Sequence, residues 1–148
     1  MKISYDLDGV LAEAPKIEHK KYGLMNGKER NQYHIQLAKH YLKAKKLYDP
    51  KEQEFYVISA RRLDRTIYSI TKDWLTERFG NRVLGLYLLN KSRTYENVIN
   101  FKCEMIKRVG INKHYEDDPN ILKGIRKNLP AVELFLINKE MSEPIKFE

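Results

Sequence analysis

The chain has 148 residues, of which 28 are Lys or Arg and 20 are Asp or Glu, so its net charge is +8 with neutral histidines. This length fits one domain over residues 1–148, and a hydrophobic content of 42% excludes a disordered chain. Because there is no long apolar run, no apolar N-terminal stretch and only one cysteine, we expect a cytoplasmic protein without a membrane span, a secretory signal, a disulfide framework or a multi-cysteine zinc site.

Five short apolar runs predict β-strands. In chain order they cover residues 2–5, 55–58, 83–89, 113–115 and 132–137. Most of these runs lack strict alternation, which is typical of strands covered on both faces. Apolar residues at helical spacing predict helices around 67–75, 98–109 and 121–129, which end at Gly80, Gly110 and Pro130. Because strands and helices alternate, we expect a Rossmann-like α/β fold with a parallel sheet of about five strands flanked by helices.

The segment 13–54 does not fit this alternation. It begins with a polar stretch and continues with a helical pattern that places on one side Tyr33, Leu37, Tyr41, Ala44 and Tyr48. One interpretation is a crossover helix that packs this stripe on the sheet, and the other is a small or minimal helical cap over a site. A crossover with a long loop can do both. The tyrosines could stack nucleic-acid bases, but core packing is the simpler role.

Carboxylates follow the first and the fourth predicted strands. Asp6 and Asp8 come directly after the first strand, and Glu116, Asp117 and Asp118 come after the fourth. The carboxyl ends of parallel strands meet at one edge of the sheet, where ligands bind. Five carboxylates at that edge would repel one another without a cation, and hard oxygen ligands suit Mg²⁺. The sequence therefore predicts a magnesium site in a basic chain.

The second predicted strand ends in a polar group of residues, Ser59, Ala60 and Arg61. A hydroxyl beside backbone N–H groups and a guanidinium can hold phosphate oxygens. An N-cap serine followed by solvent-exposed arginines would have the same sequence. Both interpretations remain open from these residues alone.

Taken together, these residues resemble the haloacid dehalogenase (HAD) superfamily of phosphatases over nearly the whole chain. Three motifs carry the resemblance: Asp6-Leu7-Asp8-Gly9-Val10-Leu11, Val57-Ile58-Ser59-Ala60-Arg61 and Tyr115-Glu116-Asp117-Asp118-Pro119. The resemblance implies a Mg²⁺-dependent phosphomonoester hydrolase. Asp6 would be the nucleophile that forms an aspartyl-phosphate, and Asp8 the general acid and base.

The resemblance also implies the binding residues. Phosphate would be bound by Gly9, Ser59, Ala60 and Arg61. The metal would be bound by Asp6, by the backbone carbonyl of Asp8 and by Asp117, with Glu116 and Asp118 in support. The family further uses a lysine that steadies the nucleophile and the phosphate. Lys102 is favoured because that lysine usually opens the helix before the last motif, and Lys91 is the alternative. His114 and the other histidines show no metal-ligand spacing, so we expect structural or solvated roles for them.

The resemblance is looser for the substrate. Arg61, directly after the second motif's hydroxyl, is similar to members of the family that act on nucleotides and on polynucleotide 3′-phosphates. The positive net charge also suits a nucleotide or a nucleic-acid terminal phosphate. A phosphatase of small metabolites such as sugar phosphates is one alternative. A non-catalytic binding module with the same fold is another.

Overall fold

The computed structural model describes residues 1–16 and 24–148. The described residues form a mixed α/β fold with a six-stranded sheet and four α-helices. The strands are β1 (Ile3–Tyr5), β2 (Phe55–Arg62), β3 (Val83–Leu89), β4 (Lys113–Glu116), β5 (Glu133–Leu136) and β6 (Ile145–Phe147). The helices are α1 (Gly27–Lys43), α2 (Arg65–Phe79), α3 (Tyr95–Val109) and α4 (Pro119–Asn128), with a short 3-10 turn η2 (Gly80–Arg82) after α2.

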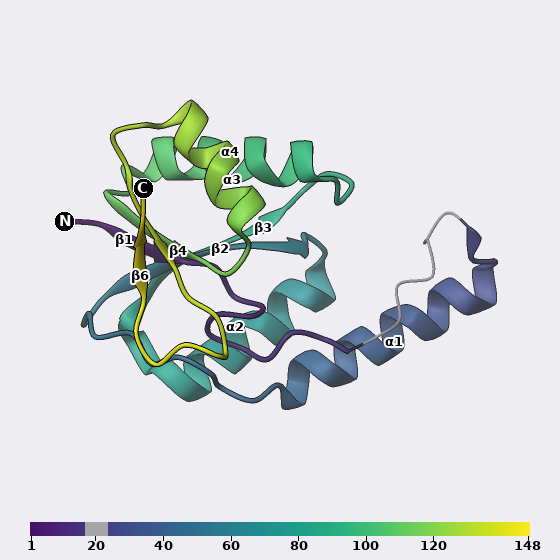
Figure 1. The fold of residues 1–148 in the computed structure, drawn as a ribbon. Helices are drawn as coiled ribbons and strands as arrows, with labels where there is room; N and C mark the ends of the chain where they lie inside the picture. Colours follow the sequence, from purple (N-terminus) through teal and green to yellow (C-terminus); the bar gives the residue numbers. More distant parts are fainter. Residues whose placement is uncertain (17–23) are drawn as a thin grey trace.

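The sheet has the strand order β3-β2-β1-β4-β5-β6. Neighbouring strands from β3 to β5 are parallel, and β6 runs antiparallel to β5. Helices α3 and α4 cover one face of the sheet, whereas α1 and α2 lie on the other side (Figure 1). The predicted Rossmann-like parallel sheet is therefore confirmed. The chain reverses its direction of winding beside β1, which makes the carboxyl end of β1 the expected place for a ligand.

Strand β6 is an addition that the sequence did not predict. It has three residues, Ile145–Phe147, and pairs with β5 at the edge of the sheet. Three residues are too few to show a periodic pattern in the sequence. The strand forms because it pairs with β5, not because of its composition.

The predicted ends of α2 at Gly80 and of α3 at Gly110 agree with the structure, and side chains cap the starts of both helices. The side chain of Asp64 accepts a hydrogen bond from the Ile67 backbone N–H at the start of α2, and Thr94 does the same for Asn97 at the start of α3. Gly110 ends α3 in the left-handed conformation, with φ 82°. Any other residue would be strained at this position.

The core occupies both faces of the sheet. On the α1–α2 side, the Tyr5 ring stacks on Tyr115 with ring centroids 4.4 Å apart, and both are largely buried. On the other side, Ile58 of β2 and Leu122 and Ile125 of α4 are fully buried where α3 and α4 pack on the sheet. None of the helices that the structure describes is long and apolar enough to cross a membrane.

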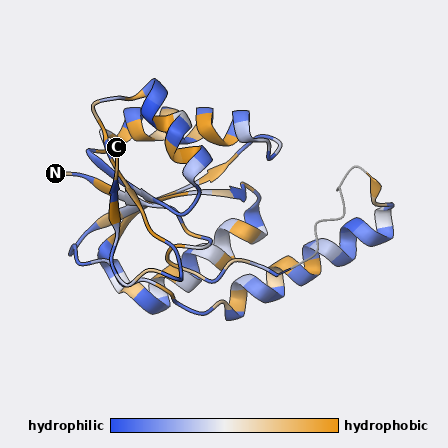
Figure 2. Ribbon diagram, in the orientation of Figure 1, coloured by the Kyte–Doolittle hydropathy of each residue, from blue (hydrophilic) through white to orange (hydrophobic). Residues whose placement is uncertain are grey.

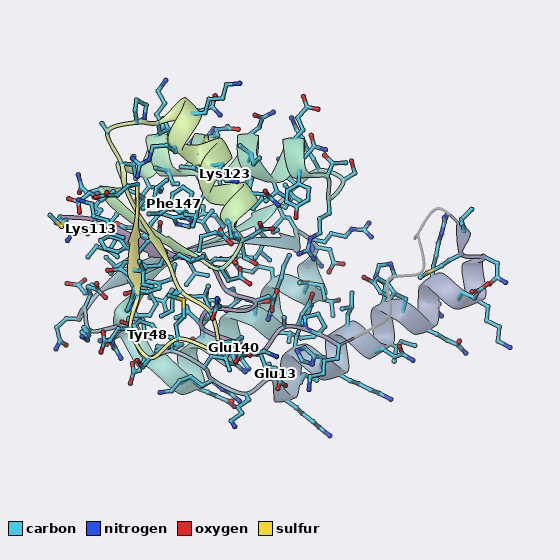
Figure 3. All side chains as sticks on the ribbon, viewed as in Figure 1. Glu13, Tyr48, Lys113, Lys123, Glu140 and Phe147 are labelled. Carbon is cyan, nitrogen blue, oxygen red and sulfur yellow. The ribbon has the colours of Figure 1, made fainter. Side chains whose placement is uncertain are left out.

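Helix α1 of the segment 13–54 packs against α2 and then projects beyond the sheet (Figure 1). It is largely hydrophilic (Figure 2), and Tyr41 is its one buried residue. Glu13 lies beside its sheet-proximal end (Figure 3), where the Glu13 carbonyl and the His40 ring nitrogen are 2.7 Å apart.

The predicted stripe of this segment is only partly helical. The helix stops at Lys43, so Ala44 and Tyr48 lie beyond it, which corrects the sequence pattern. The Tyr48 backbone instead donates a hydrogen bond to the Val10 carbonyl, because the chain here runs beside the loop after β1. Part of the predicted polar stretch, 17–23, lies outside the described residues.

Candidate active site

A cavity of about 470 Å³ opens at the carboxyl ends of β1, β2 and β4. Strand ends contribute Asp6, Asp8, Ser59, Ala60, Glu116, Asp117 and Asp118 to its wall, and α3 contributes Lys102. The structure thus brings together the acidic groups of both strand ends and the hydroxyl of the second motif. The remaining wall, farther from the sheet, includes Pro15, Tyr33, Arg93 and Tyr95.

Lys102 connects two of the carboxylates. Its Nζ donates hydrogen bonds to Asp6 Oδ1 at 2.9 Å and to Glu116 Oε2 at 2.5 Å. The lysine is 1% exposed and lies in the middle of α3, not at its start as the motif rule suggested. The long apolar stem of lysine can cross the packed interface while the ammonium reaches the strand ends. Lys91, the alternative, is exposed after β3.

The cluster carries more negative than positive charge. Burial and then Glu116 raise the pKa of Asp6 above its ordinary value, and the same causes raise the pKa of Asp117 to about 7. Burial also acts to raise the pKa of Glu116, but Lys102 and His114 outweigh it and hold that pKa below the usual range. Burial opposes the charge of Lys102, yet Asp6 and Glu116 raise its pKa. One lysine therefore does not neutralise the three acids.

This donor set fits a divalent cation. Asp6, Glu116 and Asp117 each offer a carboxylate oxygen, and these atoms lie within 4.8 Å of one another. An all-oxygen, buried and over-acidic site is the chemistry that Mg²⁺ prefers. The carboxylate of Asp8 is not part of this group, and the predicted ligand role of the Asp8 backbone carbonyl stays a prediction. Glu116, predicted as a supporting residue, is part of the cluster itself.

Asp8 is held by an arginine. Arg61 donates from Nε to Asp8 Oδ2 at 3.0 Å and from Nη2 to Asp8 Oδ1 at 2.7 Å. The third nitrogen, Nη1, donates to Thr71 Oγ1 at 3.0 Å, and the guanidinium lies 3.7 Å from the ring centre of Tyr41. Arg61 is 2% exposed, so its guanidinium is occupied by protein groups. The structure places it against Asp8, whereas its predicted contact with substrate phosphate stays a prediction.

The other predicted residues have local roles in shaping the site. Gly9 adopts φ 86°, and a Cβ built there would lie 2.2 Å from Asp117 Oδ2, so this glycine gives Asp117 its space. The Ser59 hydroxyl accepts a hydrogen bond from the Arg61 backbone N–H at 3.1 Å. Asp118 caps α4 through the Asn120 N–H and accepts a hydrogen bond from the Tyr95 hydroxyl at 3.0 Å.

Several residues of the site were not foreseen from the sequence. Ser4 and His114 lie two residues before Asp6 and Glu116, so the two-residue period of a strand places them on the same faces. That spacing was a usable signal. Thr71 had a weaker one, a polar residue on the apolar side of α2. The contact of Tyr41 with Arg61 joins distant parts of the chain and has no local signal.

A scan against protein-family models and a search of curated proteins each found no match for this chain. We therefore base the function on the site and on the sequence motifs.

Proposed function

We propose that the protein is a Mg²⁺-dependent phosphomonoester hydrolase that acts through an aspartyl-phosphate on Asp6. The observation that carries this proposal is the Asp6 carboxylate on the cavity wall, with Oδ1 held by buried Lys102 at 2.9 Å. A carboxylate fixed at one oxygen presents the other to a reacting group without losing further side-chain entropy. The sequence resemblance to HAD phosphatases supports the same role.

In the first step an Asp6 oxygen attacks phosphorus, and the bond between phosphorus and the ester oxygen breaks. The leaving oxygen takes a proton from Asp8. In the second step water attacks the phosphorus of the aspartyl-phosphate and gives a proton to the Asp8 carboxylate, which releases phosphate and restores Asp6. Arg61 contacts both oxygens of Asp8 and so orients this side chain at the cavity wall.

The remaining groups bind and orient the phosphate. Lys102 places a positive charge beside the attacking oxygen, and Ser59 offers a hydroxyl on the same wall. Bound Mg²⁺ would be held by Asp6, Glu116 and Asp117 and would neutralise charge between the carboxylates and the phosphate. Two anions otherwise repel, so this neutralisation lets the Asp6 carboxylate approach phosphorus.

We infer that the substrate is a nucleotide or a nucleic-acid terminal phosphate. A cavity of about 470 Å³ is of the size that accepts a nucleotide-sized ligand. Beyond the acidic cluster its wall includes two aromatic residues, Tyr33 and Tyr95, and one arginine, Arg93. Aromatic faces stack on bases, and an arginine pairs with a further phosphate or stacks on a base.

Hydrolysis of an aryl phosphate with Mg²⁺ tests the enzyme claim, followed by a panel of nucleotides, 3′-phosphorylated oligonucleotides and sugar phosphates. We expect turnover that EDTA abolishes and that Asp6→Asn lowers by about a thousandfold or more. Asp73→Asn is the matched control, because Asp73 is exposed on α2 and far from the cluster in sequence. No turnover on any phosphate would contradict the proposal, and preference for sugar phosphates would contradict the substrate class.

A further inference from the structure

A buried hydrogen-bonded chain runs beneath the acidic cluster. The Ser4 hydroxyl and His114 Nδ1 are 2.8 Å apart, and His114 Nε2 is 3.3 Å from Glu116 Oε2. Ser4 and His114 are both 0% exposed. The pairing of β1 with β4 places these two residues directly opposite each other in the parallel register. The sheet itself therefore sets the contact between them.

The hydrogen-bonding partners determine which ring nitrogen of His114 carries the proton. Glu116 is a carboxylate and can only accept, so Nε2 must be the N–H that donates to it. The other ring nitrogen, Nδ1, lies 2.8 Å from the Ser4 hydroxyl, so both nitrogens of the ring have a buried partner. Ser4 thus helps to fix the orientation of the ring that lets His114 hold Glu116.

His114 and Lys102 donate to the same oxygen of Glu116, Oε2. Two donors from different elements, β4 and α3, restrict rotation about the last torsion of this side chain. The other oxygen, Oε1, is then the one available to a cation beside Asp6 and Asp117. A buried polar residue with both ring nitrogens bonded is an orientation device of the kind that metal sites use behind their ligands.

We propose that His114, fixed by Ser4, is a positioning residue that presets Glu116 for a divalent cation. This inference rests on the proposed function, because that function assigns the cation to the cluster. His114 itself touches neither the cation nor the substrate in this scheme. It acts through Glu116, and its effect is expected on cation affinity.

The test measures Mn²⁺ affinity by electron paramagnetic resonance of the free ion, with Mn²⁺ as a probe for an oxygen site. We compare wild type with His114→Leu, His114→Asn and His114→Gln. The Gln amide can keep a donor near the position of Nε2, whereas Asn and Leu cannot. We expect the dissociation constant to rise by about tenfold or more in Leu and Asn and to stay near wild type in Gln.

The result that would overturn the proposal is equal Mn²⁺ affinity in wild type and His114→Leu, or no rescue by Gln. Leu122→Ala, a fully buried core change on α4, serves as a control for general destabilisation and should melt earlier with unchanged affinity. A ¹⁵N spectrum of wild type provides a readout that needs no variant to fold. It should show Nε2 protonated, and an unprotonated Nε2 would also overturn the proposal.

These readouts separate this proposal from the proposed function. Mn²⁺ binding that depends on His114 in a protein that hydrolyses no phosphate would leave the positioning role intact and remove the phosphatase. Phosphate hydrolysis by a protein whose Mn²⁺ affinity is unchanged in the His114 variants would support the phosphatase and overturn the positioning role. Absence of any Mn²⁺ binding by wild type would overturn both.

Discussion

Single side chains in this site are held by two or more partners, and the clearest case is Arg61. It contacts both oxygens of Asp8, the Thr71 hydroxyl and the Tyr41 ring. A planar guanidinium can match a carboxylate with two parallel hydrogen bonds while its face lies on a ring, which an ammonium cannot do. The position of Asp8, the proposed general acid and base, therefore depends on the shape of the Arg61 side chain as well as on its charge.

Arg61→Lys is predicted to lower kcat for an alkyl phosphate by about a hundredfold, because a misplaced Asp8 is a poor proton donor. For an aryl phosphate we predict a smaller loss in the rate of the first step, because an aryl leaving group departs without a proton from Asp8. Steady-state kinetics on the two esters measures the difference. Arg62→Lys is the matched control, as Arg62 is the exposed neighbour of Arg61. Equal losses in both variants would contradict the positioning of Asp8.

A second residue-scale prediction concerns pH and stability without metal. The pKa of Asp117 is raised to about 7 in the folded protein by burial and by Glu116, so the folded state binds more protons than the unfolded state between about pH 4 and pH 7. Stability from this group is present at low pH and is lost as pH rises through 7. Asp6 shifts in the same direction.

The melting temperature of metal-free protein should therefore fall from pH 5 to pH 8, and Mg²⁺ should restore more of it at pH 8 than at pH 5. Differential scanning calorimetry with EDTA and with Mg²⁺ measures this. Two groups have a lowered pKa and contribute the opposite trend. Glu116 does so only below its ordinary pKa near 4.5, outside this window, whereas His114 does so up to its ordinary pKa near 6.5, where the two carboxyl groups of Asp117 and Asp6 outweigh one imidazole. In Asp117→Asn the melting temperature of the metal-free protein should decrease less between pH 5 and pH 8 than in wild type. A pH-independent effect of Mg²⁺ would contradict the account.

At the scale of elements, the strands and helices near the site follow local sequence patterns. Apolar runs located the five parallel strands, and capping residues located the ends of α2, α3 and α4. Strand β6 and the end of α1 were not predicted, because pairing with β5 and packing near Val10 determine them. The site residues likewise divide into those with a local sequence signal and those without one. The strand-end carboxylates were predictable, whereas the Tyr41–Arg61 contact depends on how α1 docks.

Helix α1 supplies Tyr33 to the cavity and is predicted to influence substrate choice. Tyr33→Ala should raise KM for a nucleotide phosphate by about tenfold, since base stacking on an aromatic ring contributes roughly 1–3 kcal/mol. It should leave kcat/KM for a small aryl phosphate nearly unchanged. Ile35→Ala on the same helix is the matched control, because Ile35 is exposed and not part of the cavity wall. Equal effects of the two variants would contradict a role for Tyr33 in substrate binding.

At the scale of the whole molecule, charge is distributed unevenly. The chain carries a net charge of +8, but its cavity concentrates acids from β1 and β4. In the proposed function, the field of the surrounding Lys and Arg would attract phosphorylated molecules, and the acidic cluster would accept them once a cation has bound. Composition alone suggested a polyanionic partner, and the cavity places the proposed metal-binding carboxylates where such a partner would bind.

This arrangement predicts a salt effect that depends on substrate length. KM for a 3′-phosphorylated oligonucleotide should rise by about tenfold between low and near-physiological salt, because several phosphates release counterions on binding. KM for a single aryl phosphate should change much less. Initial rates across a potassium chloride series measure both. The same salt dependence for the two substrates would contradict nucleic-acid binding while leaving the hydrolytic chemistry intact.

The central claim is that Asp6 forms a bond with phosphorus. Intact-protein mass spectrometry of Asp8→Asn mixed with an aryl phosphate and Mg²⁺ tests it most directly. This variant can still expel an aryl leaving group but lacks the base that activates water, so the intermediate should accumulate. We predict a mass increase of one phosphoryl group, located on the peptide that contains Asp6 and absent when Asp6→Asn is added to the variant. Turnover by wild type without any such adduct, or an adduct on another residue, would contradict the account.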